Sequence, residues 1–196
     1  MRILIIGATG TIGSAVAAAL KDKHELVLAS HSKAAEPVDI SDPASLRELF
    51  ARIGRVDAIV SAAGRAAWKP LDQLADPDFE LSLRNKLMGQ VNVIRLGIPS
   101  VSDGGSITIT AGYLSRNPAP GSSAVSLVNS ALEGFGRAAA LETPRGVRIN
   151  VVSPPWIRET LQKLGRPPGG LPAATVAQYY VRSVEGQDTG QVYDPK

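Results

Sequence analysis

The first thirteen residues, MRILIIGATGTIG, constrain the fold more than any other stretch of the chain. An apolar run at residues 3–6 leads into Gly7, Gly10 and Gly13, and an alanine-rich segment follows at residues 14–20. Because glycine has no Cβ, the backbone of such a turn can approach a phosphate, and the free N–H groups of a helix's first turn point towards it. This spacing predicts a buried strand, a nucleotide-binding turn and a helix. The same residues would also suit a plain strand–turn–helix.

Composition narrows the class of protein. A chain of 196 residues suggests one domain, residues 1–196. Its formal charge of +3 comes without the clustered lysine and arginine of a nucleic-acid binder. It has no cysteine and only two histidines, His24 and His31, so we expect no metal site. No run approaches the roughly 20 apolar residues of a membrane span, and the N-terminal run is a strand rather than a signal peptide. We expect a cytoplasmic protein without nucleic-acid or membrane partners.

The rest of the chain alternates short apolar runs with helical patterns. The best-marked helix follows Asp42 and Pro43, which suit the cap and the first helical position, and it ends at Gly54. Strands alternating with helices predict an α/β fold, a parallel sheet with helices on both faces. The further predicted strands are residues 26–29, 37–40, 56–60, 106–110, 147–152 and 190–193. The further predicted helices are residues 78–96, 122–141 and 175–184, with irregular connections at residues 66–77, 112–121 and 156–172.

Periodicity predicts which faces of these helices are buried. Apolar residues at positions i, i+3, i+4 and i+7 form one face of a helix. The faces predicted in this way are Leu46, Leu49, Phe50 and Ile53; Leu83, Leu87, Val91 and Ile94; and Val125, Val128, Leu132 and Phe135.

The segment after the second predicted strand reads Ser30-His31-Ser32-Lys33. In a dinucleotide-binding fold an acidic residue here would accept the ribose hydroxyls, whereas hydroxyl and cationic residues favour a 2′-phosphate. The segment contains no Asp or Glu, so we predict NADP rather than NAD as the cofactor. A solvated turn without a ligand is the alternative interpretation. After the fourth predicted strand, the small residues of Ser61-Ala62-Ala63-Gly64 leave room for a ligand at the edge of the sheet.

Five places in the chain resemble the short-chain dehydrogenase/reductase family. They are the glycine turn at residues 7–13, Asp39-Ile40, residues 61–64, the pair Leu132-Glu133-Gly134-Phe135 and residues 148–154, and Thr189-Gly190-Gln191-Val192. The resemblance implies a Rossmann-like doubly wound parallel sheet of about seven strands, in the order 3-2-1-4-5-6-7. It also implies hydride transfer between NADP and a small carbonyl compound or alcohol. The implied cofactor-binding residues are Gly7, Thr9, Gly10, Thr11, Ile12, Gly13, Ser30, His31, Ser32, Lys33, Asp39, Ile40, Ala62, Ala63, Gly64, Pro154 and Ile157.

The chain departs from the family pattern in two local ways. The helix usually found between the second and third strands is missing, and the loop after Pro154 is short. The family's Pro-Gly reads Pro154-Pro155 here.

The family's catalytic residues, an Asn, a Ser and a Tyr-x-x-x-Lys pair, are all replaced. Val125 stands at the tyrosine position and Asn129 at the lysine position. Gly112 stands near the serine position, and Lys86, next to Asn85, stands at the asparagine position. The resemblance therefore supports the fold and the cofactor better than the reaction.

Hydride transfer to a carbonyl normally needs a nearby acid, and a phenol of pKa about 10 needs a neighbouring cation to serve as one. Tyr113, after the fifth predicted strand, and Lys86, on the adjacent helix, are the candidates, with Asn129 beside them. The alternative interpretation is that neither residue is functional, Tyr113 being a loop tyrosine and Lys86 a solvated helix lysine. Thr110 and Ser126 are further hydroxyls nearby. Two functions remain open. The first is an NADP-dependent oxidoreductase with a rebuilt acid, and the second is an NADP-binding redox sensor or partner subunit without turnover.

The two long predicted helices, residues 78–96 and 122–141, resemble those through which family members dimerise. Their many small residues permit close approach of helices, which predicts a homodimer or homotetramer. The alternative is that these small residues only pack the helices against their own sheet.

Overall fold

Seven parallel strands form one sheet, and their order confirms the predicted topology. The computed structural model describes all residues 1–196. The order is β3-β2-β1-β4-β5-β6-β7, so the direction of winding reverses between β1 and β4, where sheets of this type bind ligands. The strands are β1 (Arg2–Ile6), β2 (Glu25–Ser30), β3 (Glu36–Pro37), β4 (Val56–Ser61), β5 (Val101–Thr110), β6 (Arg148–Val152) and β7 (Val192–Tyr193).

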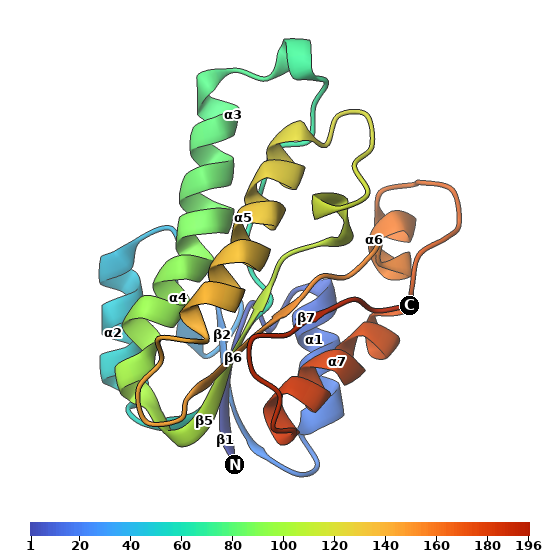
Figure 1. Ribbon diagram of the computed structural model, residues 1–196. Helices are drawn as coiled ribbons and strands as arrows, with labels where there is room; N and C mark the ends of the chain where they lie inside the picture. Colours follow the sequence, from blue (N-terminus) through green and yellow to red (C-terminus); the bar gives the residue numbers. More distant parts are fainter.

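Helices cover both faces of the sheet (Figure 1). One face is covered by α1 (Thr11–Leu20) and α7 (Ala173–Glu185). The other is covered by α2 (Pro43–Ile53), α4 (Gly89–Gly97) and α5 (Ser123–Ala139). The remaining helices are α3 (Asp76–Leu81), α6 (Arg158–Lys163), the 3₁₀ turns Leu71–Gln73, Ile98–Ser100 and Tyr113–Ser115, and the π-helical segment Ser82–Met88. No helix is both long enough and apolar enough to cross a membrane.

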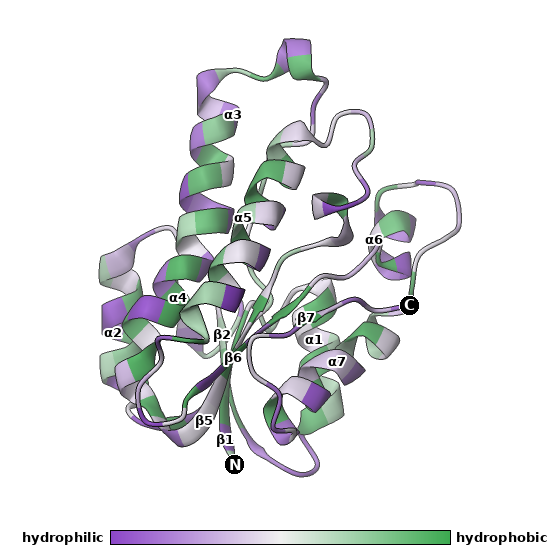
Figure 2. Cartoon of the chain, viewed as in Figure 1, coloured by the Kyte–Doolittle hydropathy of each residue, from purple (hydrophilic) through white to green (hydrophobic).

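The period of two along β1 divides the hydrophobic core between the two faces. Ile3 and Ile5 pack with α1 and α7, whereas Leu4 and Ile6 pack with α2, α4 and α5. All four side chains are buried. In Figure 2 the helices carry both hydrophobic and hydrophilic bands. A central strand buried on both faces explains why residues 3–6 form an unbroken apolar run.

Local signals explain why α2 matches its prediction. The Asp42 carboxylate accepts a hydrogen bond of 2.8 Å from the amide of Ala44, and Pro43 occupies the first turn. Gly54 ends the helix with φ +66°. The predicted apolar face is buried: Leu46, Leu49, Phe50 and Ile53.

The long helix predicted at residues 78–96 is a composite. It begins earlier, at Asp76, and the π-helical segment Ser82–Met88 separates α3 from α4. The wider π turn shifts the register of the side chains, so the predicted apolar face is not continuous. Leu83 is consequently 39% exposed, whereas Ile94 is buried.

Three further predictions of local structure are corrected. The third strand, predicted at residues 37–40, is limited to Glu36–Pro37, because the chain turns at Asp39 after Val38 donates to the Ser30 carbonyl. The connection at residues 156–172 contains α6. The fifth strand begins before residue 106, at Val101.

Candidate functional site

The glycine turn between β1 and α1 forms a cradle that side chains would fill. Gly7 has φ +85°, and a Cβ there would lie 2.8 Å from the carbonyl oxygen of Ala62. A Cβ on Gly13 would collide with the carbonyl group of Gly7. The first helical hydrogen bond runs from the Ser14 amide to Gly10, so the three amides before Ser14 remain free. This backbone fits the phosphates of a dinucleotide.

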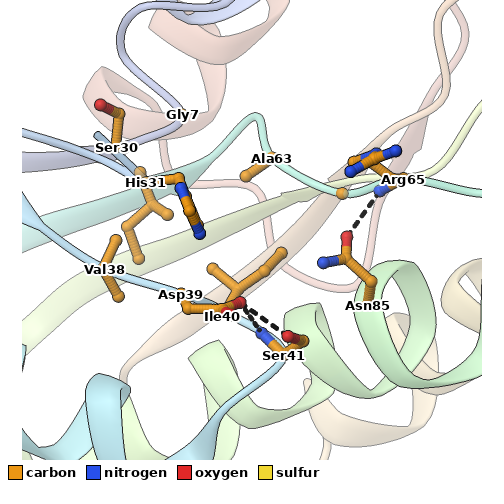
Figure 3. Close-up of a pocket in the computed structure, with 12 residues that line it drawn as sticks. Gly7, Ser30, His31, Val38, Asp39, Ile40, Ser41, Ala63, Arg65 and Asn85 are labelled. Atoms are coloured by element: carbon orange, nitrogen blue, oxygen red, sulfur yellow. Dashed lines mark hydrogen bonds between the residues drawn. The ribbon is translucent and has the colours of Figure 1, made fainter. Parts of the chain in front are cut away.

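A first cavity, of about 510 Å³, opens beside this turn. Ser30 and His31 lie on one side of it, and Arg65 and Asn85 lie on the other (Figure 3). The Asn85 side chain accepts a hydrogen bond of 2.7 Å from the Arg65 amide. The full lining is Ile6, Gly7, Ser30, His31, Val38, Asp39, Ile40, Ser41, Ala63, Gly64, Arg65 and Asn85.

Asp39 is the acidic residue of the first cavity. One of its carboxylate oxygens accepts hydrogen bonds from the amide and the hydroxyl of Ser41, at 2.9 and 2.7 Å. These bonds, with the positive potential of His31 and Arg84, hold the pKa of Asp39 below its usual value. An ionised carboxylate with a second, free oxygen can accept a hydrogen bond from a hydroxyl or an amino group of a ligand.

The turn predicted to bind the 2′-phosphate reaches the first cavity only through its first half. Ser30 and His31 line the cavity, whereas Ser32 and Lys33 are exposed outside the lining. The Ser30 hydroxyl accepts hydrogen bonds from the amides of Lys33 and Ala34, at 3.0 and 2.9 Å, and so shapes the turn. Thr9 also lies outside the lining of either cavity.

A second cavity, of about 200 Å³, lies on the other side of the glycine turn. It brings together five parts of the chain: α1, the π-helical segment, the end of β5 with its loop, α5, and the loop after β6 with α6. The predicted residues Ile12, Lys86, Tyr113, Asn129, Pro154 and Ile157 all line it. The rest of the lining is Thr110, Ala111, Gly112, Leu114, Val125, Pro155, Trp156 and Thr160.

Lys86 is the only charged residue in the second cavity. It lies in the π-helical segment and packs against Gly64, and its Nζ donates a hydrogen bond of 3.1 Å to the Ala111 carbonyl. Burial without a carboxylate partner lowers the pKa of Lys86 to about 8. The ammonium group is therefore close to its titration point near neutral pH and keeps donors free for a ligand.

The nearby hydroxyls differ in availability. The Tyr113 hydroxyl makes no hydrogen bond within the chain, although its residue lines the second cavity. The Thr110 hydroxyl donates to the Ser61 carbonyl and pairs with the buried Tyr180 hydroxyl, both at 2.6 Å. Ser126 pairs with Ser122 at 3.1 Å and lies outside the lining. Tyr113 and Thr160 are therefore the lining residues of the second cavity whose hydroxyls make no hydrogen bond within the chain.

Asn129 has a buried side-chain oxygen without a hydrogen-bond partner. Its side chain is 2% exposed and packs against Gly112, and its amide oxygen has no partner. A buried polar atom without a partner costs free energy, so a ligand group that donates to it would stabilise the site. Val125, one helical turn earlier, presents only an apolar surface to the cavity.

The contacts of two side chains at the site were not predicted from the sequence. Glu133 on α5 is 5% exposed and accepts hydrogen bonds of 2.6 Å from the hydroxyls of Ser115 and Ser153, which ties the loops after β5 and β6 together. Trp156 lines the second cavity and contacts Trp68, with ring centroids 5.2 Å apart. Neither has a local signal, because the partners come from different loops.

Known proteins resemble the chain over nearly its whole length. A family model described as enoyl-(acyl carrier protein) reductase matches residues 7–193. The crystal structure of protein lin1944 from Listeria innocua is 40% identical, with a TM-score of 0.96; the match covers 99% of this chain and 98% of that one. A small-chain dehydrogenase in complex with NADPH shares the fold, with 24% identity, a TM-score of 0.88 and coverage of 99% and 95%.

Curated relatives are longer than this chain. An uncharacterized NAD-dependent oxidoreductase of Mycobacterium tuberculosis is 31% identical over 128 residues, which are 61% of this chain and 46% of that protein. The chain spans about half the length of the curated relatives it matches.

Proposed function

The chain belongs to the short-chain dehydrogenase/reductase family, and we propose that it is an NADP(H)-dependent oxidoreductase with a rebuilt catalytic site. The proposed reaction transfers hydride between the nicotinamide and a small carbonyl compound or alcohol. Its cofactor would lie across the glycine turn, with the adenosine half in the first cavity and the nicotinamide half towards the second. The free amides before Ser14 and the Asp39 carboxylate support this placement.

One observation carries the proposal: Lys86 and Tyr113 share one small, largely apolar cavity beside the glycine turn. When bound, NADPH supplies hydride to a carbonyl carbon. The Lys86 ammonium, with its pKa lowered to about 8, donates the proton to the carbonyl oxygen. The Tyr113 hydroxyl donates a second hydrogen bond to that oxygen. The Asn129 amide oxygen accepts a hydrogen bond from a hydroxyl of the substrate or the cofactor.

Substitution of the two proposed groups tests the reaction. We expect Lys86→Ala and Tyr113→Phe each to abolish measurable carbonyl reduction, because a placed acid contributes about 10²–10⁴ to the rate. NADPH affinity, measured by fluorescence titration, should stay nearly unchanged in both variants. Full activity in both would show that the assigned roles are wrong. Ser126→Ala serves as the control, since that hydroxyl lies outside the second cavity.

A second candidate function has its own observation. Val125 lines the second cavity at the position of the family's tyrosine, and it has no proton to give. A protein that binds NADPH without turnover, such as a redox sensor or a partner subunit, would need no proton donor there. Tight NADPH binding without reduction of any member of a broad ketone panel would favour this second function.

Cofactor preference is the finer part of the proposal. Ser30 and His31 line the first cavity, and the turn that they begin has no acidic residue before Glu36. We expect NADPH to bind at least about tenfold more tightly than NADH, because one charge-assisted hydrogen bond contributes about 1.5–3 kcal/mol. The M. tuberculosis relative is described as NAD-dependent, so the preference needs a direct measurement.

Ser30→Asp is the variant that tests this preference. A carboxylate can still accept the amides of Lys33 and Ala34, so the turn keeps its shape while repelling a 2′-phosphate. Calorimetric dissociation constants should show the preference narrowed or reversed. Ser30→Ala separates the added charge from the lost hydroxyl. Equal affinities for the two cofactors in the unmodified protein would contradict the proposal.

The proposed assembly is a homodimer or homotetramer in the cytoplasm. A groove of about 390 Å³ lies between α4 and α5, and Val91, Ile94 and Phe135 supply apolar surface to it. An apolar groove between the helices predicted to pair supports self-association.

A further inference from the structure

Lys163 contacts the residue that follows the glycine turn, Thr11, although the two are 152 residues apart in sequence. It is the last residue of α6, in the loop after β6, and its Nζ lies 3.2 Å from the Thr11 hydroxyl at the start of α1. Its side chain is exposed and makes no ion pair with a carboxylate.

The electrostatics of this contact are unfavourable without an anion. The N-terminus of α1 carries the positive end of the helix dipole, and its first turn contains no acidic residue and no side-chain cap. A lysine ammonium beside that end adds positive charge to positive charge. An anion placed between Lys163 and the free amides before Ser14 would satisfy both groups.

The two cavities indicate which anion belongs there. Gly7 lines the first cavity, whereas Ile12 and Thr160 line the second. Thr11 precedes Ile12, and Lys163 follows Thr160 by one turn of α6, so the Lys163–Thr11 contact lies where a dinucleotide would pass from one cavity to the other. The group between the two nucleosides of a dinucleotide is its pyrophosphate.

The loop that carries Lys163 is anchored at both ends. The two carboxylate oxygens of Glu159 accept hydrogen bonds from the Ala173 amide at the start of α7, at 2.9 and 3.1 Å. Ile157 and Leu171 pair as an isolated parallel bridge. The loop is thus tied to α7 while Trp156, at its beginning, lines the second cavity.

We propose that Lys163 binds the pyrophosphate of the dinucleotide and fastens the loop after β6 over the glycine turn. The inference rests on the proposed function, since it needs a dinucleotide at this turn. It makes Lys163 a cofactor-binding residue and links occupancy of the turn to the wall of the second cavity through Trp156.

Two fragments of the cofactor test the assignment by calorimetry. ADP-ribose contains the pyrophosphate, whereas adenosine contains no phosphate. We expect Lys163→Gln to weaken ADP-ribose binding about tenfold and to leave adenosine binding within twofold, as the loss of one charge-assisted hydrogen bond predicts. Arg166→Gln is the matched control, because it removes one positive charge from the same exposed loop.

The outcomes separate the inference from the proposed function. Equal ADP-ribose affinities in Lys163→Gln and Arg166→Gln would overturn the role of Lys163 while leaving the dinucleotide site intact. Failure of the unmodified protein to bind ADP-ribose would overturn both. In a Trp68→Phe background, Trp156 is the remaining tryptophan. ADP-ribose should then change the fluorescence of Trp156 when Lys163 is present and not in Lys163→Gln; an equal change in both would overturn the link to the cavity wall.

Discussion

Lys86 is the residue whose ionisation decides the proposed chemistry. Reduction requires its ammonium form, so kcat/KM for a ketone should fall as pH rises through about 8, the lowered pKa. Alcohol oxidation requires the neutral amine as base and should rise over the same range. Lys86→Arg stays protonated, which should remove the step at pH 8 from the profile. A profile with the same step in Lys86→Arg would assign the titration to another group.

The same pKa shift separates loss of function from loss of fold. Because burial lowers the pKa of Lys86, the unfolded chain binds the proton more tightly, and the stability contributed by this site rises from about pH 8 towards 10.5. Below pH 8 the buried ammonium carries its full desolvation cost. We therefore expect Lys86→Met to raise the Tm at pH 7 while activity is lost. A lowered Tm would mean that other contacts of Lys86 outweigh the desolvation.

At the scale of elements, Gln90 joins α4 to the end of β5. It is fully buried, and its amide group accepts the Thr110 N–H at 2.7 Å and donates to the Thr110 carbonyl at 2.5 Å. Gln90→Leu should destabilise the protein by about 2 kcal/mol or more, because each unsatisfied backbone group costs about 1–3 kcal/mol. Urea unfolding measures the loss, and Gln162→Leu, on the exposed surface of α6, should leave stability nearly unchanged.

The elements that were predicted well carry their signals locally. Helix α2 has its cap, its proline and its terminal glycine within the segment itself. The π-helical segment has no comparable signature, because bonding from i to i+5 leaves no spacing that sequence reveals. Helix α6 depends on distant partners, such as the Ala173 amide that Glu159 accepts. The third strand was predicted too long because Ser41 draws the Asp39 carboxylate into a turn.

The candidate site divides in the same way. The glycine turn was predicted because its strand, glycines and helix are contiguous. Alignment with the family pattern placed Lys86 at the asparagine position, and Tyr113 was expected near it because it follows the fifth predicted strand. The structure puts both in one cavity, while their chemical roles stay predictions. The hydrogen bonds of Glu133 and the contact of Lys163 with Thr11 were not predicted, since the sheet order brings their partners from other strands and loops.

For the whole molecule, we expect a homodimer or a larger assembly through α4 and α5. Ala138 is exposed and lines the groove between these helices. Ala138→Arg places a charged side chain in the proposed contact and should yield monomers by light scattering at micromolar concentration. Leu141→Arg, in the turn just after the same helix and outside the groove, is the control. A monomeric unmodified protein would contradict the expected assembly.

Because no helix lies between β2 and β3, the turn proposed to select the cofactor is short and can be exchanged as a unit. The strands on either side of residues 31–35 are paired with each other, Ala29 with Glu36 and Ser30 with Pro37. The two ends of this segment are therefore held in place by the sheet. None of these five residues touches the second cavity. Exchanging them for a loop of equal length from an NAD-selective donor would re-engineer coenzyme choice without redesigning the reaction centre. A library that varies Ser30 together with residues 31–35 should therefore be enough to change the proposed cofactor preference.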